Sequence, residues 1–160
     1  MVAEATRPPS FRRRCVVVLS GLLLMFSLRV FAQLLQAWSP VEALPPFEAW
    51  ASGALPYWML VICQVLIIIA CARVIWRLSR GLIMPSMATG KFLLSLGGIY
   101  FGLMCLRLII GLTVATGHYW FSARLPTFFH LVLAGFVLVY GWFHVRGFYA
   151  SQPPYVEQTA

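Results

Sequence analysis

Polar side chains that could bind a ligand interrupt long apolar stretches of this sequence. The clearest are Arg29, Gln33 and Gln36, inside the apolar run from about Cys15 to Trp38. At 100° per residue, the three fall within about 60° of one another on one face of a helix. A charged group that deep in a membrane helix is costly, so it is by default a candidate for a functional site.

Three further apolar runs each contain one polar group of this kind: Gln64, Arg107 and His130. One interpretation is a binding pocket built from these side chains together with Arg29 and Gln33. The other needs no ligand. Each arginine then extends toward the membrane surface or donates to carbonyls at a helix end, and the two glutamines hold helices together.

The two arginines need partners, because unpaired cations are unfavourable in a medium of low dielectric constant. None of the apolar runs contains an acid, since the four acidic residues of the chain lie outside them. Glu42 and Glu48 are the two in the middle of the chain. We expect the counter-charge to come from these glutamates, or from an exogenous anion such as a lipid phosphate or an acidic ligand.

A histidine pair suggests a second kind of site. His130 and His144 are 14 residues apart, which places them within about 40° on one helix face and roughly 21 Å apart along its axis. That spacing resembles the ligand helices of b-type cytochromes, where two haems are stacked across a membrane. Each haem needs a ligand from a second helix, and the chain has only His118 besides. A homodimer or a partner subunit would have to supply the rest.

Other chemistry finds little support in the sequence. The four cysteines lie in apolar runs without a C-x-x-C pair, so we expect packing roles and neither a metal site nor disulfide exchange; they are Cys15, Cys63, Cys71 and Cys105. No hydrolase elbow, phosphate loop, zinc pattern or nucleotide fingerprint is present. We therefore expect a protein without catalytic activity.

The composition indicates that this chain is built for lipid. Its hydrophobic content is 61% and its charged content is 10%, whereas a soluble domain carries roughly 25% charged residues. The net charge of +8 does not indicate nucleic-acid binding, because the basic residues lie at the ends of the apolar runs. This distribution is typical of cytoplasmic membrane flanks.

Four apolar runs are long enough to cross a bilayer. They predict membrane-spanning helices at about 15–38, 56–77, 92–116 and 126–145. The loops between them are short, which favours an all-α, up-down four-helix transmembrane bundle in which consecutive helices are antiparallel neighbours. Prolines and a capping-box pattern in the segment before the second run predict a short interfacial lid of one or two helical turns.

The distribution of Lys and Arg predicts the orientation. The N-terminal flank, the linker between the second and third runs, and the C-terminal flank are basic, whereas the first loop has no Lys or Arg. Both termini are then cytoplasmic, with residues 1–14 a disordered basic segment and 147–160 a polar tail. The first run also has features of a signal peptide, with Val30-Phe31-Ala32 as the cleavage site. Its length and Arg29 favour an uncleaved helix.

With this topology, all four spans place a polar group in the outer half of the membrane. Arg29 and Arg107 each lie nine residues, about 13 Å, from the outer end of their helices. Gln64 and His130 lie eight and four residues from theirs. We therefore expect a pocket that is open to the outer face and covered by the first loop.

The sequence favours a small bacterial-type inner-membrane protein that serves as a binding, assembly or accessory subunit. A membrane redox subunit that binds quinone or b-type haem is the alternative, and a lipid-handling or transporter-like protein is a further one. Gly98 and Gly102 have the G-x-x-x-G spacing that permits close helix contact. They predict a contact with another membrane subunit or a second copy of this chain, or else packing within the bundle.

Overall fold

The computed structural model describes residues 9–47, 50, 56–114 and 124–151, and within these it contains four α-helices and no strand. The helices are α1 (Pro9–Trp38), α2 (Tyr57–Ser79), α3 (Met87–Thr113) and α4 (Arg124–Tyr149). Each is long and apolar enough to cross a membrane. The predicted all-helical fold with four helices of this kind is confirmed.

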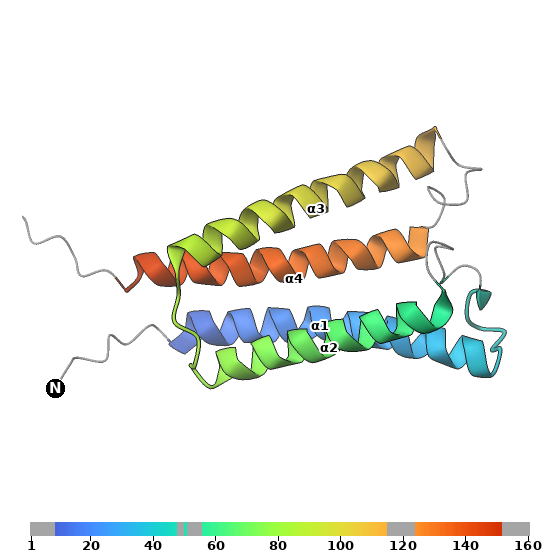
Figure 1. Cartoon of the computed structure of the whole chain (residues 1–160), viewed down its shortest axis with the longest axis horizontal. Helices are drawn as coiled ribbons and strands as arrows, with labels where there is room; N and C mark the ends of the chain where they lie inside the picture. The colour runs from blue at the N-terminus through green and yellow to red at the C-terminus, as the bar shows by residue number, and fades with distance from the viewer. Residues whose placement is uncertain (1–8, 48–49, 51–55, 115–123, 152–160) are drawn as a thin grey trace, which may run out of the picture.

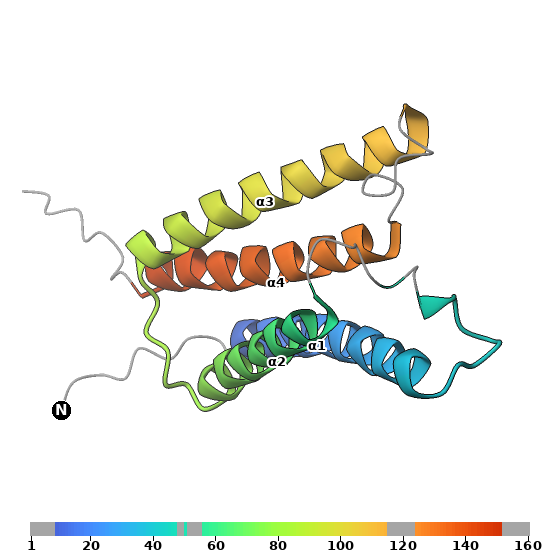
Figure 2. The same cartoon turned by 45° about the vertical axis from the view of Figure 1, so that its right-hand side comes forward.

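The helices stand in a row, with α1 and α4 in the middle. Consecutive helices run antiparallel (Figure 1). Close packing joins α1 to α2, α1 to α4, and α3 to α4, which gives the spatial order α2–α1–α4–α3. Figure 2 shows the α1–α2 hairpin beside the α3–α4 hairpin. The prediction that all consecutive helices would be neighbours is therefore wrong for α2 and α3, which lie at opposite edges.

The connection from α2 to α3 is longer than neighbouring helices require. Residues 80–86 link the two helices, and seven extended residues reach up to roughly 23 Å. Two helices packed side by side have axes only about 8–10 Å apart. A short loop therefore permits neighbouring helices without requiring them.

Both ends of this linker are held by specific contacts. Arg80 caps α2, and Gly81 follows it with φ of +72°, a left-handed conformation that favours glycine. Ser86 caps α3, because its hydroxyl accepts a hydrogen bond from the Thr89 amide. The Ser86 amide in turn donates to Nδ1 of His144 at 3.1 Å, which ties the linker to α4.

The first helix begins earlier than the sequence suggested. It starts at Pro9, so residues 9–14, predicted to be disordered, belong to α1. Phe11 explains the extension, because its ring stacks on Phe143 of α4 with centroids 6.3 Å apart. The Arg146 guanidinium lies 5.3 Å from the same ring. These contacts order the basic turn of the helix.

Glycines form the seam between α3 and α4, but they are not the predicted ones. A Cβ added to Gly90, Gly97 or Gly141 would lie 3.1 Å or less from atoms of the facing helix, so these positions need glycine for close approach. A Cβ on Gly98 or Gly102 would meet nothing within 4 Å. The G-x-x-x-G pair is thus exposed and takes no part in packing among the described residues.

The main apolar core lies toward the end of the helices that contains the α2–α3 linker. Its buried members come from α1, α2 and α4: Cys15, Leu19, Leu78, Phe136 and Phe143. Cys15 thus has the packing role expected of it. The polar groups gather at the opposite end, where α1 finishes and both α2 and α4 begin (right in Figure 1).

Candidate functional site

The polar face of α1 is buried. Arg29, Gln33 and Gln36 are 7%, 0% and 8% exposed, although the helix presents many large apolar side chains to its surroundings. Since α1 packs against both α2 and α4, one of its faces lies between these neighbours. The three residues share that face because of their helical spacing, as the sequence predicted.

An amide pair joins this face to α2. Nε2 of Gln64 donates a hydrogen bond to Oε1 of Gln33 at 3.1 Å. Each amide retains one buried atom without a hydrogen-bond partner among the described residues, Nε2 of Gln33 and Oε1 of Gln64. Buried polar groups are nearly always paired in proteins. The pair therefore holds the helices together and still has hydrogen-bonding capacity for another molecule.

Arg29 has a backbone oxygen and an aromatic ring as its partners. Its Nη2 donates to the carbonyl oxygen of Trp50 at 3.0 Å, and its Cζ lies 5.5 Å from the centroid of the Phe129 ring. Nε is buried and has no hydrogen-bond partner in the described part of the chain. The guanidinium is thus held in place with part of its donor capacity unused.

The first loop covers this end of the helices through local hydrogen bonds. The buried Trp50 donates from its indole nitrogen to the Pro45 carbonyl at 2.9 Å. Oε1 of Gln36 accepts from the Val41 amide at 3.0 Å. Residues 39–46 form turns and bends where a capping-box helix was predicted, because Gln36 engages the Val41 amide and prolines follow soon after. The rest of the predicted lid lies largely outside the described residues.

A cavity of about 180 Å³ lies beneath this loop. Trp50 of the first loop contributes to its lining, and the other lining residues come from α1, α2 and α4. The polar side chains that line it are Arg29, Gln64 and His130, while the apolar lining includes Phe26, Leu60, Ile67, Pro126, Phe129 and Leu133, with the Cys63 thiol between them. Three of the predicted site residues thus share one cavity, and Gln33 is bonded to one of them.

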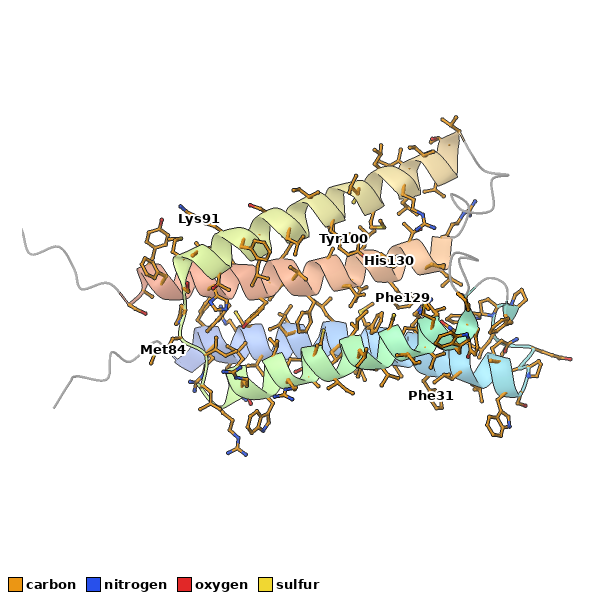
Figure 3. All side chains as sticks on the ribbon, viewed as in Figure 1. Phe31, Met84, Lys91, Tyr100, Phe129 and His130 are labelled. Atoms are coloured by element: carbon orange, nitrogen blue, oxygen red, sulfur yellow. The ribbon has the colours of Figure 1, made fainter. Side chains whose placement is uncertain are left out.

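His130 connects the cavity to α3. Its Nδ1 lies 2.6 Å from the hydroxyl of Tyr100, and Figure 3 shows these two side chains between α3 and α4. Arg107 is seven residues beyond Tyr100, hence on the same face of α3, and is 6% exposed. It does not line the cavity. Arg29 therefore lines the cavity and Arg107 does not, although His130 lies in electrostatic range of both.

The predicted glutamate partners are not part of the described cavity. Glu42 is exposed and does not line it, and Glu48 lies outside the described residues. The Arg29 partner that the structure does describe is the Trp50 carbonyl. The residues of this site that were missed at the sequence level include Trp50, Phe129 and Tyr100. Only Tyr100 had a usable signal, its seven-residue spacing from Arg107.

His144 does not fit the predicted haem arrangement. It is 4% exposed, and its Nδ1 accepts the Ser86 amide hydrogen. A neutral imidazole that accepts at Nδ1 carries its proton on Nε2, so neither nitrogen is then available to iron. His130 bonds Tyr100. Among the described residues, no group of three His, Cys, Asp or Glu side chains could hold a metal ion.

The arrangement suits the binding of a small polar group in an otherwise apolar space. Arg29 offers a cationic donor, Gln64 an acceptor, and Phe129 and Trp50 aromatic surface. Such a mixture of apolar lining and a few converging polar groups is typical of ligand sites. Comparison with protein-family models, with curated proteins and with solved structures found no match.

Proposed function

We propose that this chain is a multi-pass membrane protein that binds a small ligand in the cavity between α1, α2 and α4. It acts as a binding, assembly or accessory subunit without catalysis of its own. The observation that supports this most strongly is Arg29, a cation that lines the cavity, is 7% exposed and has a buried Nε without a partner among the described residues. A buried charge with unused donor capacity is costly unless a ligand completes it.

The orientation follows from the basic residues. Arg73, Arg77 and Arg80 lie near the end of α2 and Lys91 near the start of α3, whereas the first loop has no Lys or Arg. We propose a bacterial-type inner membrane with both termini in the cytoplasm. The cavity then lies in the outer half of the membrane, about 13 Å below the end of α1 at Trp38.

The topology is tested by cysteine accessibility in a variant without native cysteines. Glu42→Cys, in the first loop, should react with a membrane-impermeant maleimide in intact cells. Met84→Cys, in the exposed α2–α3 linker, should react only after the cells are permeabilised. The reverse labelling pattern would show that the termini lie outside and that the cavity lies in the cytoplasmic half of the membrane.

The binding function is tested on purified protein in detergent micelles. Thermal unfolding is followed with and without a total lipid extract of the expression host, for the wild type, Arg29→Met and the matched control Arg73→Met. Arg73 is exposed on α2 and does not line the cavity. We expect the extract to raise the melting temperature of the wild type and of Arg73→Met, but not of Arg29→Met. An equal rise in all three would exclude the cavity as the site.

A quinone-binding redox subunit is the second candidate. The observation in its favour is the Tyr100–His130 pair at the back of the cavity, since a quinone carbonyl accepts hydrogen bonds of the kind that an imidazole offers. Decylubiquinone in the same unfolding assay tests it, with Arg29→Met as comparison. An absorbance spectrum after haem-sufficient expression tests the haem alternative, because bound haem would give a Soret band.

A further inference from the structure

The cavity lies between α2 and α4, two helices that line it from different sides. Both helices pack against α1, but they are not closely packed against each other, and the cavity takes four lining residues from each. Trp50, which is 5% exposed, lines it as well. Cys63 lines the cavity and is nevertheless exposed at the surface of α2. Among the described residues, Cys63 therefore marks a route out of the cavity that passes sideways between the two helices.

In a membrane, this side faces hydrocarbon. The neighbours of Cys63 on the outer surface of α2 include Ile62 and Leu66, which are exposed and apolar. Water and small hydrophilic solutes are excluded from that region. A ligand that reaches the cavity by this route must be soluble in the lipid phase.

The polar wall of the cavity favours an anionic group. Arg29 is the charged residue among the lining side chains, and no acidic side chain lines the described cavity. The four helices contain no Asp or Glu at all. An anionic oxygen would neutralise the guanidinium and accept a hydrogen bond from it, a charge-assisted hydrogen bond of the stronger kind. A neutral head group would leave the buried cation without a counter-charge.

The size of the cavity points to a ligand that is only partly enclosed. Its volume is about 180 Å³, whereas pockets that enclose a drug-sized ligand measure about 300–1,000 Å³. A polar head and the first carbons of a chain can be held here, with the remainder outside. Phe26, Leu60 and Leu133 supply apolar contacts along the wall.

We propose that the occupant is an amphiphile with a carboxylate or phosphate head, which enters from the bilayer between α2 and α4. Its head binds Arg29, and its acyl chain extends past Cys63 into the lipid. This inference rests on the proposed ligand-binding function and specifies the ligand class and the route. The two head groups share one chemistry, an anionic oxygen on an acyl chain, and the test separates them.

The test measures saturable binding of radiolabelled oleate to the protein in phosphatidylcholine nanodiscs, with empty nanodiscs subtracted. Oleyl alcohol and oleoyl lysophosphatidate are the competitors. We expect oleyl alcohol, which has the same chain and no charge, to compete at least tenfold more weakly than unlabelled oleate. Competition by lysophosphatidate would show that a phosphate head is also accepted, and its failure would restrict the site to carboxylates. Equal competition by the alcohol and oleate would overturn the anionic assignment, and this comparison needs no variant.

The route is tested with matched tryptophan substitutions on α2. Cys63→Trp places bulk at the opening, and Val65→Trp places it on an exposed position of α2 that does not line the cavity. We expect oleate affinity to fall at least tenfold in Cys63→Trp and Arg29→Met, and to stay unchanged in Val65→Trp. Full affinity in Cys63→Trp with loss in Arg29→Met would overturn the lateral route.

The two proposals can fail separately. If oleate and lysophosphatidate do not bind, but the lipid extract still stabilises the wild type and not Arg29→Met, the cavity binds another ligand and only this inference is wrong. If Arg29→Met responds to the extract as the wild type does, both are wrong.

Discussion

The hydrogen bond between Gln33 and Gln64 permits a quantitative test of how the polar end of the molecule is held together. Each amide uses one atom in the bond and has one buried atom without a described partner. Gln33→Leu or Gln64→Leu alone breaks the bond and leaves the other amide buried, which costs about 1–3 kcal/mol. Changing both removes all the buried amide atoms, so the second substitution should cost little.

The double-mutant cycle isolates this coupling. Hydrogen bonds between membrane helices contribute on average about 0.6 kcal/mol and at most about 1.7 kcal/mol. We therefore expect the double variant to be more stable than the sum of the single effects by about 1 kcal/mol, which lies between these two values. The assay is reversible unfolding in mixed micelles with increasing SDS, followed by circular dichroism.

Gln36 provides the matched control. It lies on the same face of α1 and is buried, but it accepts its hydrogen bond from the Val41 amide and not from α2. Gln36→Leu and Gln64→Leu should therefore be additive. If the cycle of Gln33 and Gln64 is additive as well, the amide bond contributes nothing to stability, and the inference that this pair holds α1 against α2 is refuted.

Three other substitutions test the remaining features. Gly141→Ala should lower stability by about 1–3 kcal/mol through overpacking, because its Cβ would lie 3.0 Å from a backbone nitrogen of α3. Gly98→Ala, with open space around it, should change stability by less than about 0.5 kcal/mol. Equal effects of the two substitutions in SDS unfolding would contradict the close glycine packing between α3 and α4. Leu19→Ala, in the apolar core, should cost about 2–5 kcal/mol in the same assay without changing oleate affinity. Tyr100→Phe removes the hydroxyl that positions His130 and should weaken oleate binding about fivefold, which corresponds to a hydrogen bond of about 1 kcal/mol. Unchanged oleate affinity would show that the Tyr100–His130 pair does not contribute to binding.

The helices themselves could be predicted from the sequence because lipid leaves few alternatives. A segment that crosses a bilayer must satisfy its backbone hydrogen bonds internally, so a long apolar run is read as a helix. The four observed helices differ from the predicted spans by a few residues at most ends. The buried face of α1 was predictable too, because Arg29, Gln33 and Gln36 distinguish it from an otherwise apolar surface.

Which helices pack against each other could not be predicted, because helices built for lipid have few polar residues to distinguish a buried face from an exposed one. Apart from Arg107, the third helix is apolar on nearly all sides, so its pattern gives little indication of which face is buried. Gly98 and Gly102 matched a spacing rule, but Gly90 and Gly97 are the glycines that face α4. The order α2–α1–α4–α3 depends on how far the 80–86 linker reaches. The Arg29 partner is a backbone carbonyl, and every residue type offers that group.

The position of the cavity relative to the core explains how a space can persist in this protein. Lipid tails are as apolar as the helices, so no hydrophobic force closes the gap between α2 and α4. At the opposite end, Leu19, Phe136 and Phe143 fix the helices by packing. At the cavity end, the Trp50 carbonyl and the Phe129 ring hold the guanidinium of Arg29 before a ligand arrives. Binding then requires little rearrangement of the site, and preorganisation of this kind favours affinity.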